Sequence, residues 1–72
     1  MEIPRLGKYK HYKGSLYELI HIARHSEEPD VLMAVYRALY GEGEVWVRPL
    51  SMWDEEVIVN GCVTRRFTYA GD

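Results

Sequence analysis

Cysteine is almost absent from this 72-residue chain, which contains only Cys62. A single thiol cannot form an intrachain disulfide and cannot supply a cysteine-based zinc site. No apolar run approaches the ~20 residues that a membrane-spanning helix needs, and the first residues lack the apolar stretch of a secretory signal peptide. We therefore expect a protein of the reducing cytoplasm that has no membrane partner.

Neither sign of charge dominates the chain. Nine Lys and Arg stand against eleven Asp and Glu, which gives a net charge of −2 at pH 7. A general nucleic-acid binder needs many cations facing phosphates, so this balance argues against that class. A local single-stranded nucleic-acid site, in which tyrosines stack on bases beside basic residues, is kept as an alternative. Its basic residues are Lys8, Lys10, Lys13, Arg65 and Arg66.

The chain is also too short to enclose much empty space. A domain of this size buries about 60% of the surface that its unfolded chain exposes, so few residues can be spared to line a deep pocket. Its composition, 47% hydrophobic with six Tyr, two Trp and one Phe, is sufficient for collapse into one globular domain over residues 1–72. We expect any binding site to be a groove or a flat patch.

Glycines separate runs that are rich in Val, Ile, Tyr and Trp, a pattern typical of strands joined by turns. It predicts strands over residues 8–12, 16–25 and 45–48. A tight helical turn is expected after Pro49. Asn60-Gly61 suits a type I′ turn because both residues tolerate a positive φ, and this turn predicts a hairpin between residues 57–59 and 62–69.

Residues 31–40 allow two interpretations. Their apolar residues fall at helical spacing, with Asp30 and Gly41 placed to cap the two ends of a helix. The same stretch is also an apolar strand, which a short glycine-containing turn joins to Val45 and the next strand. The local pattern leaves strand and helix open.

Several motifs, in the same order and over about residues 7–69, together resemble one protein family. They are His11-Tyr12-Lys13-Gly14 with Tyr17, Ala23-Arg24-His25-Ser26-Glu27, Val35-Tyr36-Arg37-Ala38-Leu39-Tyr40-Gly41, Trp46-Val47-Arg48-Pro49-Leu50 with Met52 and Glu55, and Arg66-Phe67. The chain resembles the compact bacterial domain-of-unknown-function family number sixteen fifty-three. The resemblance implies a mostly β small barrel, and therefore a strand over residues 31–40. It implies no activity, because the family has no established function or catalytic residues.

The strand pattern and the resemblance together predict an all-β domain. We expect a small five-stranded SH3-like barrel with a short 3-10 turn after Pro49. The residues expected in its core are mainly aliphatic: Ile20, Ile22, Ala23, Val35, Val45, Val47, Leu50, Val57, Val59 and Phe67.

Enzymatic chemistry has little support in the sequence. His21 and His25, placed on one strand, would stand about 13 Å apart, which is too far for one metal ion. No neighbouring feature of the sequence lowers the pKa of Cys62, so a reactive thiol is not expected. A small hydrolase built on His25 and Cys62 is the remaining enzymatic alternative. We assign no catalytic residue, no metal and no cofactor.

Arginine and aromatic residues favour a binding function. Guanidinium groups bind carboxylates or phosphates, and aromatic faces hold flat or apolar groups. The sequence therefore predicts a non-catalytic binding module for a protein segment or an acidic ligand, as a monomer or weak homodimer. The open alternative is that these side chains only cover the ends of the barrel. The predicted ligand-binding residues are Arg24, His25, Tyr36, Arg37, Tyr40, Trp46 and Arg48.

Overall fold

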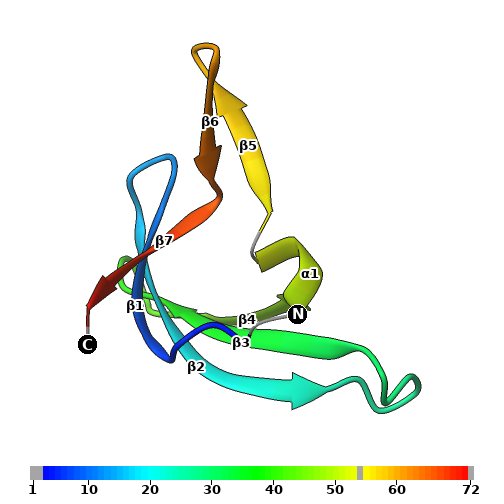
Figure 1. The fold of residues 1–72 in the computed structure, drawn as a ribbon. Helices are drawn as coiled ribbons and strands as arrows, with labels where there is room; N and C mark the ends of the chain where they lie inside the picture. The colour runs from blue at the N-terminus through cyan, green and yellow to red at the C-terminus, as the bar shows by residue number, and fades with distance from the viewer. Residues whose placement is uncertain (1–2, 54, 72) are drawn as a thin grey trace.

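The computed structural model describes residues 3–53 and 55–71. Its main feature is a five-stranded antiparallel sheet in the order β4-β3-β2-β1-β7, and the remaining two strands form a separate hairpin, β5-β6 (Figure 1). The predicted β class is thus confirmed. The elements are β1 Gly7–His11, β2 Leu16–Arg24, β3 Leu32–Ala38, β4 Val45–Pro49, α1 Leu50–Trp53, β5 Glu56–Val59, β6 Cys62–Arg65 and β7 Phe67–Gly71.

The segment that was open between helix and strand is strand β3. It pairs antiparallel with β2 on one side and with β4 on the other. Ala34, Tyr36 and Ala38 are buried whereas Val35 and Arg37 between them are not, which is the two-residue period of a strand. The strand indicated by the family resemblance is therefore confirmed. The helical spacing in this segment arises by coincidence, because the strand carries apolar residues on both of its faces.

The β5–β6 hairpin forms around the predicted turn. Asn60 has φ 52° and Gly61 has φ 80°, as a type I′ turn requires. The predicted strand over residues 62–69 is wrong at one point, because it is divided at Arg66. The Arg66 amide donates to the carbonyl of Glu55, and the Arg66 carbonyl accepts from the amide of Tyr12. The chain thereby leaves the hairpin and continues as β7 beside β1, while the hairpin extends away from the sheet (Figure 1).

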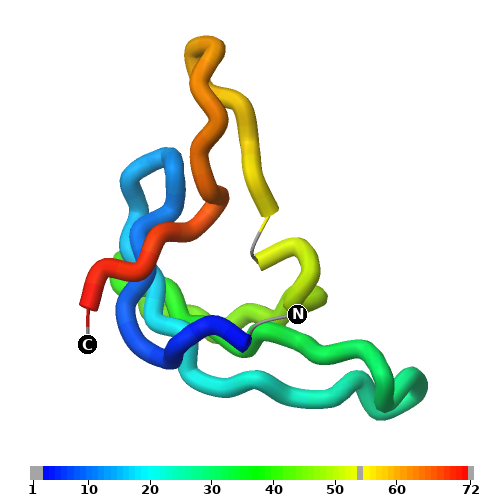
Figure 2. The backbone as a smooth tube through the Cα atoms, in the orientation of Figure 1, coloured from blue at the N-terminus to red at the C-terminus, as the bar shows by residue number. Residues whose placement is uncertain are grey.

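The turn after Pro49 is a single α-helical turn rather than the predicted 3-10 turn. It carries Leu50 and Trp53 over one face of the sheet, where each is only 1% exposed. Strand β2 is strongly curved (Figure 2). A register shift between Leu19 and His21 interrupts its pairing with β3 near the middle of the strand. Such a bulge bends a strand locally, which helps the sheet to curve.

On β3 and β4 the core lies on the face opposite to the one predicted. Val45 and Val47 were expected inside, but they are 58% and 61% exposed. Aromatic rings fill the interior instead, and the small Ala34 and Ala38 beside Tyr36 leave room for them. Of the predicted core, Leu50 and Phe67 are buried and Ile22 is in contact with it. The buried residues are Tyr9, Leu19, Ala34, Tyr36, Ala38, Leu50, Trp53 and Phe67.

Candidate functional site

Two of the predicted site residues stabilise the turn between β2 and β3. Arg24 donates from Nη1 to the carbonyl of Pro29 at 2.8 Å. His25 Nδ1 accepts from the backbone amides of Glu27 and Glu28, both at 3.1 Å. Both side chains are therefore bonded to the backbone of this turn.

Arg37 and Tyr40 are also held by neighbouring side chains. Arg37, which is exposed, forms an ion pair with Glu18 on the adjacent strand β2. The Tyr40 hydroxyl lies 2.7 Å from that of Tyr17. This hydrogen bond, together with burial, raises the pKa of Tyr17 to about 12, so its phenol is protonated at neutral pH. Trp46 lies on β4 and is half exposed.

Arg48 and Tyr36 do come together as the sequence predicted. The Arg48 guanidinium lies 5.8 Å from the centre of the Tyr36 ring and 5.6 Å from that of Phe67, and its Nε donates to the Tyr36 hydroxyl at 3.3 Å. Its Nη1 is buried and has no hydrogen-bond partner. Within the described part of the chain no carboxylate forms an ion pair with Arg48. Aromatic faces therefore surround this cation, which has no counter-charge among the described residues.

The surroundings of Arg48 are positively charged. His11 contacts the Phe67 ring, with centroids 5.0 Å apart. Burial lowers the pKa of His11, and the positive charges of Arg66, Lys13 and Arg48 lower it further. A neutral His11 matches its hydrogen bonding, because Nδ1 accepts from the backbone amide of Lys13 at 3.2 Å.

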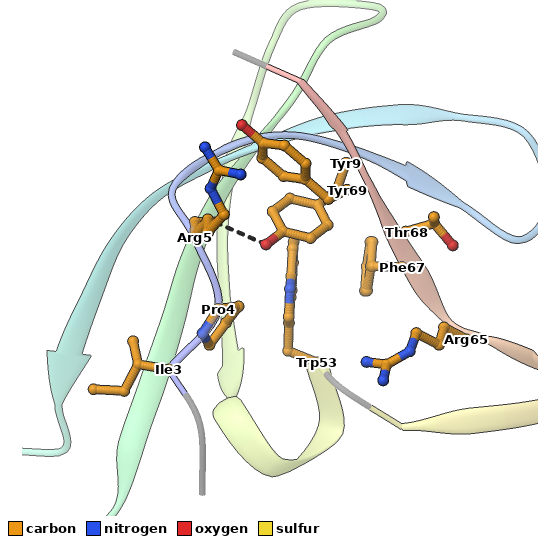
Figure 3. A pocket seen from close by; sticks show the side chains of 9 residues that line it. All are labelled: Ile3, Pro4, Arg5, Tyr9, Trp53, Arg65, Phe67, Thr68 and Tyr69. Atoms are coloured by element: carbon orange, nitrogen blue, oxygen red, sulfur yellow. Dashed lines mark hydrogen bonds between the residues drawn. The ribbon is translucent and has the colours of Figure 1, made fainter.

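A cleft of about 470 Å³ lies between the N-terminal segment, α1 and β7 (Figure 3). None of the predicted ligand-binding residues lines it. Two arginines and four aromatic rings do, and no acidic side chain is among its described lining residues. We call this the aromatic cleft, and its residues are Ile3, Pro4, Arg5, Tyr9, Trp53, Arg65, Phe67, Thr68 and Tyr69.

Hydrogen bonding and ring contacts fix the geometry of the aromatic cleft. The Tyr9 hydroxyl donates to the carbonyl of Arg5 at 2.7 Å, which ties the N-terminal segment to β1. The Arg5 guanidinium lies 4.6 Å from the centre of the Tyr69 ring. The Tyr9 ring meets Trp53 and Tyr69 edge to face, at 5.3 and 5.4 Å. Figure 3 shows Arg5 at one end of the cleft and Arg65 at the other, with the Trp53 indole edge-on between them.

This arrangement can bind a ligand that has both an anionic and a flat or apolar group. A guanidinium held against an aromatic ring can bind an anionic group, while the remaining ring edges contact a flat or apolar one. Sequence reasoning missed the cleft because Arg5 and Tyr69 lie near opposite ends of the chain. The alternation of Phe67 and Tyr69 was a usable signal, since it places both rings on one face of a strand.

The family model DUF1653, described as a protein of unknown function, matches residues 7–69. The chain belongs to the DUF1653 family. The family indicated by the sequence motifs is thereby confirmed, while Ile3, Pro4 and Arg5 of the aromatic cleft lie outside the matched residues.

A solved structure shows the same fold in another member of DUF1653. The crystal structure of a DUF1653 protein from Bordetella bronchiseptica is similar to this chain, with 34% sequence identity and a TM-score of 0.85. The match covers 94% of this chain and 88% of that one. No curated protein matches the sequence. The comparisons thus define the family and the fold but name no ligand.

The hydrolase pair is not brought together, whereas two basic residues of the nucleic-acid alternative, Lys13 and Arg66, both lie close enough to His11 to lower its pKa. Figure 1 shows the β2–β3 turn, which contains His25, at the opposite end of the molecule from the β5–β6 turn beside Cys62, so the hydrolase pair is not assembled. Lys8 and Lys10 flank the buried Tyr9 and therefore face away from the aromatic cleft. Arg66 is paired with Glu55 at 2.7 Å.

Residues 3–53 and 55–71 lack two further features. These residues contain no group of three or more His, Cys, Asp and Glu side chains placed to hold a metal ion. They contain no helix with the length and apolar character needed to cross a bilayer.

Proposed function

We propose that this DUF1653 protein is a non-catalytic binding module, and that the aromatic cleft binds the acidic side chain of a protein segment. The observation that carries the proposal is Arg5, whose guanidinium lies 4.6 Å from the Tyr69 ring at the end of the cleft. No described acidic residue lines this cleft to neutralise that charge. A ligand carboxylate would supply the missing negative charge.

The shape of the cleft supports a ligand with a flat or apolar group beside its carboxylate. Its volume of about 470 Å³ is in the range of small-ligand sites and accommodates one or two side chains of a peptide. Tyr69, which is half-buried, presents ring surface to such a group, and the buried rings of Tyr9 and Trp53 lie beside it. A segment that has an acidic residue next to an aromatic one matches both halves of the cleft.

The proposed site lies at a different place from the predicted one but uses the same types of residue. The sequence analysis placed an arginine and aromatic patch around Tyr36, Trp46 and Arg48, and the cleft uses the same residue types around Arg5. The SH3-like barrel also remains a proposal: the sheet has five strands, with β4 and β7 at its two ends. The cytoplasmic location expected from the sequence stays a prediction.

An NMR titration tests the proposal. The 15N-labelled protein is titrated with an acetylated, amidated Glu-Tyr-Glu peptide, with the matching Gln-Tyr-Gln peptide, and with a short oligo-dT strand. We expect the acidic peptide to shift the amides of Tyr9 and Tyr69 and the indole signal of Trp53. The amide peptide should bind more weakly, because it lacks the carboxylates that pair with Arg5.

Two arginine variants with the same change in charge make the test specific. Arg5→Gln should weaken binding of the acidic peptide by about tenfold, the value of one charge-assisted hydrogen bond. Arg24→Gln should leave binding unchanged, because Arg24 lies at the far end of β2. Equal effects of the two variants, or shifts that avoid the cleft, would refute the site. Tighter binding of oligo-dT than of the peptide would favour the nucleic-acid alternative.

A further inference from the structure

We propose that two copies of this chain associate through strand β4, which pairs with its own copy. β4 is an end strand of the sheet, since β3 is the only strand that pairs with it in the described part of the chain. Its first three residues are all apolar and at least half exposed: Val45 at 58%, Trp46 at 50% and Val47 at 61%. An edge strand that is both exposed and apolar favours pairing with another strand.

The backbone groups of β4 that are free to pair can be identified from its bonding to β3. The Ala38 amide donates to the carbonyl of Glu44, so Glu44 directs its backbone polar groups toward β3. These groups alternate in direction along an antiparallel strand. Those of Trp46 and Arg48 therefore also point to β3, whereas those of Val45 and Val47 point to the open edge.

Only one register uses all four of these free groups. In an antiparallel pairing centred on Trp46, Val45 lies opposite Val47 of the second copy, and each such pair exchanges two hydrogen bonds. A shift toward the C-terminus places Pro49, which has no N–H, in a bonding position. A shift toward the N-terminus requires the Gly43 amide, which already donates to the Tyr40 carbonyl. The backbone therefore selects the register centred on Trp46.

The side chains agree with this register on both faces. On the outer face, Val45 and Val47 of each copy meet and cover one another, which removes the two exposed valines from water. On the other face, Trp46 lies beside its own copy. Arg48 lies opposite Glu44 of the second copy. This places a carboxylate opposite the residue whose guanidinium, held against Tyr36 and Phe67, forms no ion pair within the described part of its own chain.

The inference does not rest on the proposed ligand. No β4 residue lines the aromatic cleft, so loss of peptide binding and loss of association are separate outcomes. The symmetry is that of a two-fold dimer in which one surface meets itself, and it produces a closed pair rather than a fibre. The two five-stranded sheets become one continuous sheet of twice that number.

Cysteine cross-linking tests the register directly in chains that also carry Cys62→Ser. Residues opposite one another in an antiparallel pair have Cα atoms about 4.5 to 5.5 Å apart, which a disulfide can bridge. Trp46→Cys should therefore form a covalent dimer with itself under mild oxidation. Val45→Cys and Val47→Cys should each cross-link poorly alone and readily when mixed. Efficient cross-linking of Val45→Cys alone would overturn the register.

Sedimentation equilibrium tests the association without cross-linking. We expect the mass to rise with concentration from 8.4 kDa toward twice that value. Val47→Lys should raise the dissociation constant by about tenfold or more, because it places two like charges beside the interface. Ile58→Lys is the matched control, an aliphatic residue that is 76% exposed on the hairpin instead. A protein that stays monomeric up to about 1 mM, or a dimer that only Ile58→Lys weakens, overturns the proposal.

Discussion

The indole of Trp53 lies parallel to the ring of Phe67, with centroids 3.8 Å apart and an angle of 7° between the planes. Both residues are buried, at 1% and 4% exposure. Trp53 comes from α1 and Phe67 is the first residue of β7, so this one contact joins the helical turn to the last strand. It also forms part of the wall of the aromatic cleft.

Removing the indole should unfold much of the protein. Trp→Ala in a core costs about 3–5 kcal/mol, and a domain of this size has only a few kcal/mol of net stability. We therefore expect Trp53→Ala to lose most of its native circular dichroism at 25 °C. Trp46→Ala, at a residue that is half exposed on β4, should keep the native spectrum. Similar urea midpoints for the two variants would contradict the central role of Trp53.

The stability of the fold should fall on acidification because of His11. Its pKa in the folded protein lies below the ordinary value of 6.5, first through burial and then through the charges of Arg66, Lys13 and Arg48. In the interval between this lower pKa and 6.5, the unfolded chain binds a proton that the folded chain does not. The contribution of His11 is therefore present above pH 6.5 and is lost as the pH falls toward the lower pKa.

Urea unfolding at a series of pH values checks this expectation. His11→Asn should reduce the loss of stability between pH 7 and pH 5, while its side-chain oxygen can still accept from the Lys13 amide. His21→Asn changes an exposed histidine of β2 and is the control. If His11→Asn leaves the pH dependence as it is in the natural sequence, the charged surroundings inferred for His11 are wrong.

The turn of the β5–β6 hairpin requires a positive φ at Gly61. Gly61 has φ +80°, and a Cβ added there would meet nothing within 4 Å. The cost of Gly61→Ala therefore comes from the backbone alone, and we expect about 1 kcal/mol of local destabilisation. Amide exchange of β5 and β6 should accelerate, whereas Asn60→Gly should leave it nearly unchanged. Equal exchange in Gly61→Ala and the unaltered chain would argue against the type I′ turn.

The sequence located most strands correctly but not the face that each one buries. Strand positions follow from local features such as the Asn60-Gly61 turn and the alternation around β1. The buried face of β4 does not follow from local features, because both of its faces carry apolar residues. The two-residue alternation then does not indicate which face lies inside. Val45 and Val47 were assigned to the core as aliphatic residues. The observed interior is instead set by rings such as Tyr36, which fit against small neighbours on β3.

The candidate site shows the same limit at longer range. The residue types, arginine beside aromatic rings, could be predicted from composition. Their location could not, because Arg5 meets Tyr69 only when the N-terminal segment and β7 come together across the sheet. Arg24 and His25 were plausible ligand contacts in sequence, yet their side chains are used by the β2–β3 turn. Local patterns carry no information on such pairings.

Two acidic residues that precede β4 look equivalent in the sequence but occupy different places in the proposed dimer. Both Glu42 and Glu44 are exposed. The register centred on Trp46 places Glu44 opposite Arg48 of the second copy, whereas a register shifted toward the N-terminus by one residue in each copy would place Glu42 there. Glu44→Gln should therefore weaken the dimer by about two- to fivefold at low salt, the usual value of an ion pair that is partly open to water. Glu42→Gln should have no effect.

Sedimentation at two ionic strengths supplies the measurement for this pair of variants. The effect of Glu44→Gln should shrink in about 0.5 M salt, because screening weakens an exposed ion pair, while the valine contacts of the outer face persist. A larger effect of Glu42→Gln would show that β4 pairs in the shifted register, with Val45 opposite its own copy. Because both substitutions remove one negative charge from the same short segment, a change in net charge alone would affect them equally. A difference between them therefore reports on which carboxylate faces Arg48.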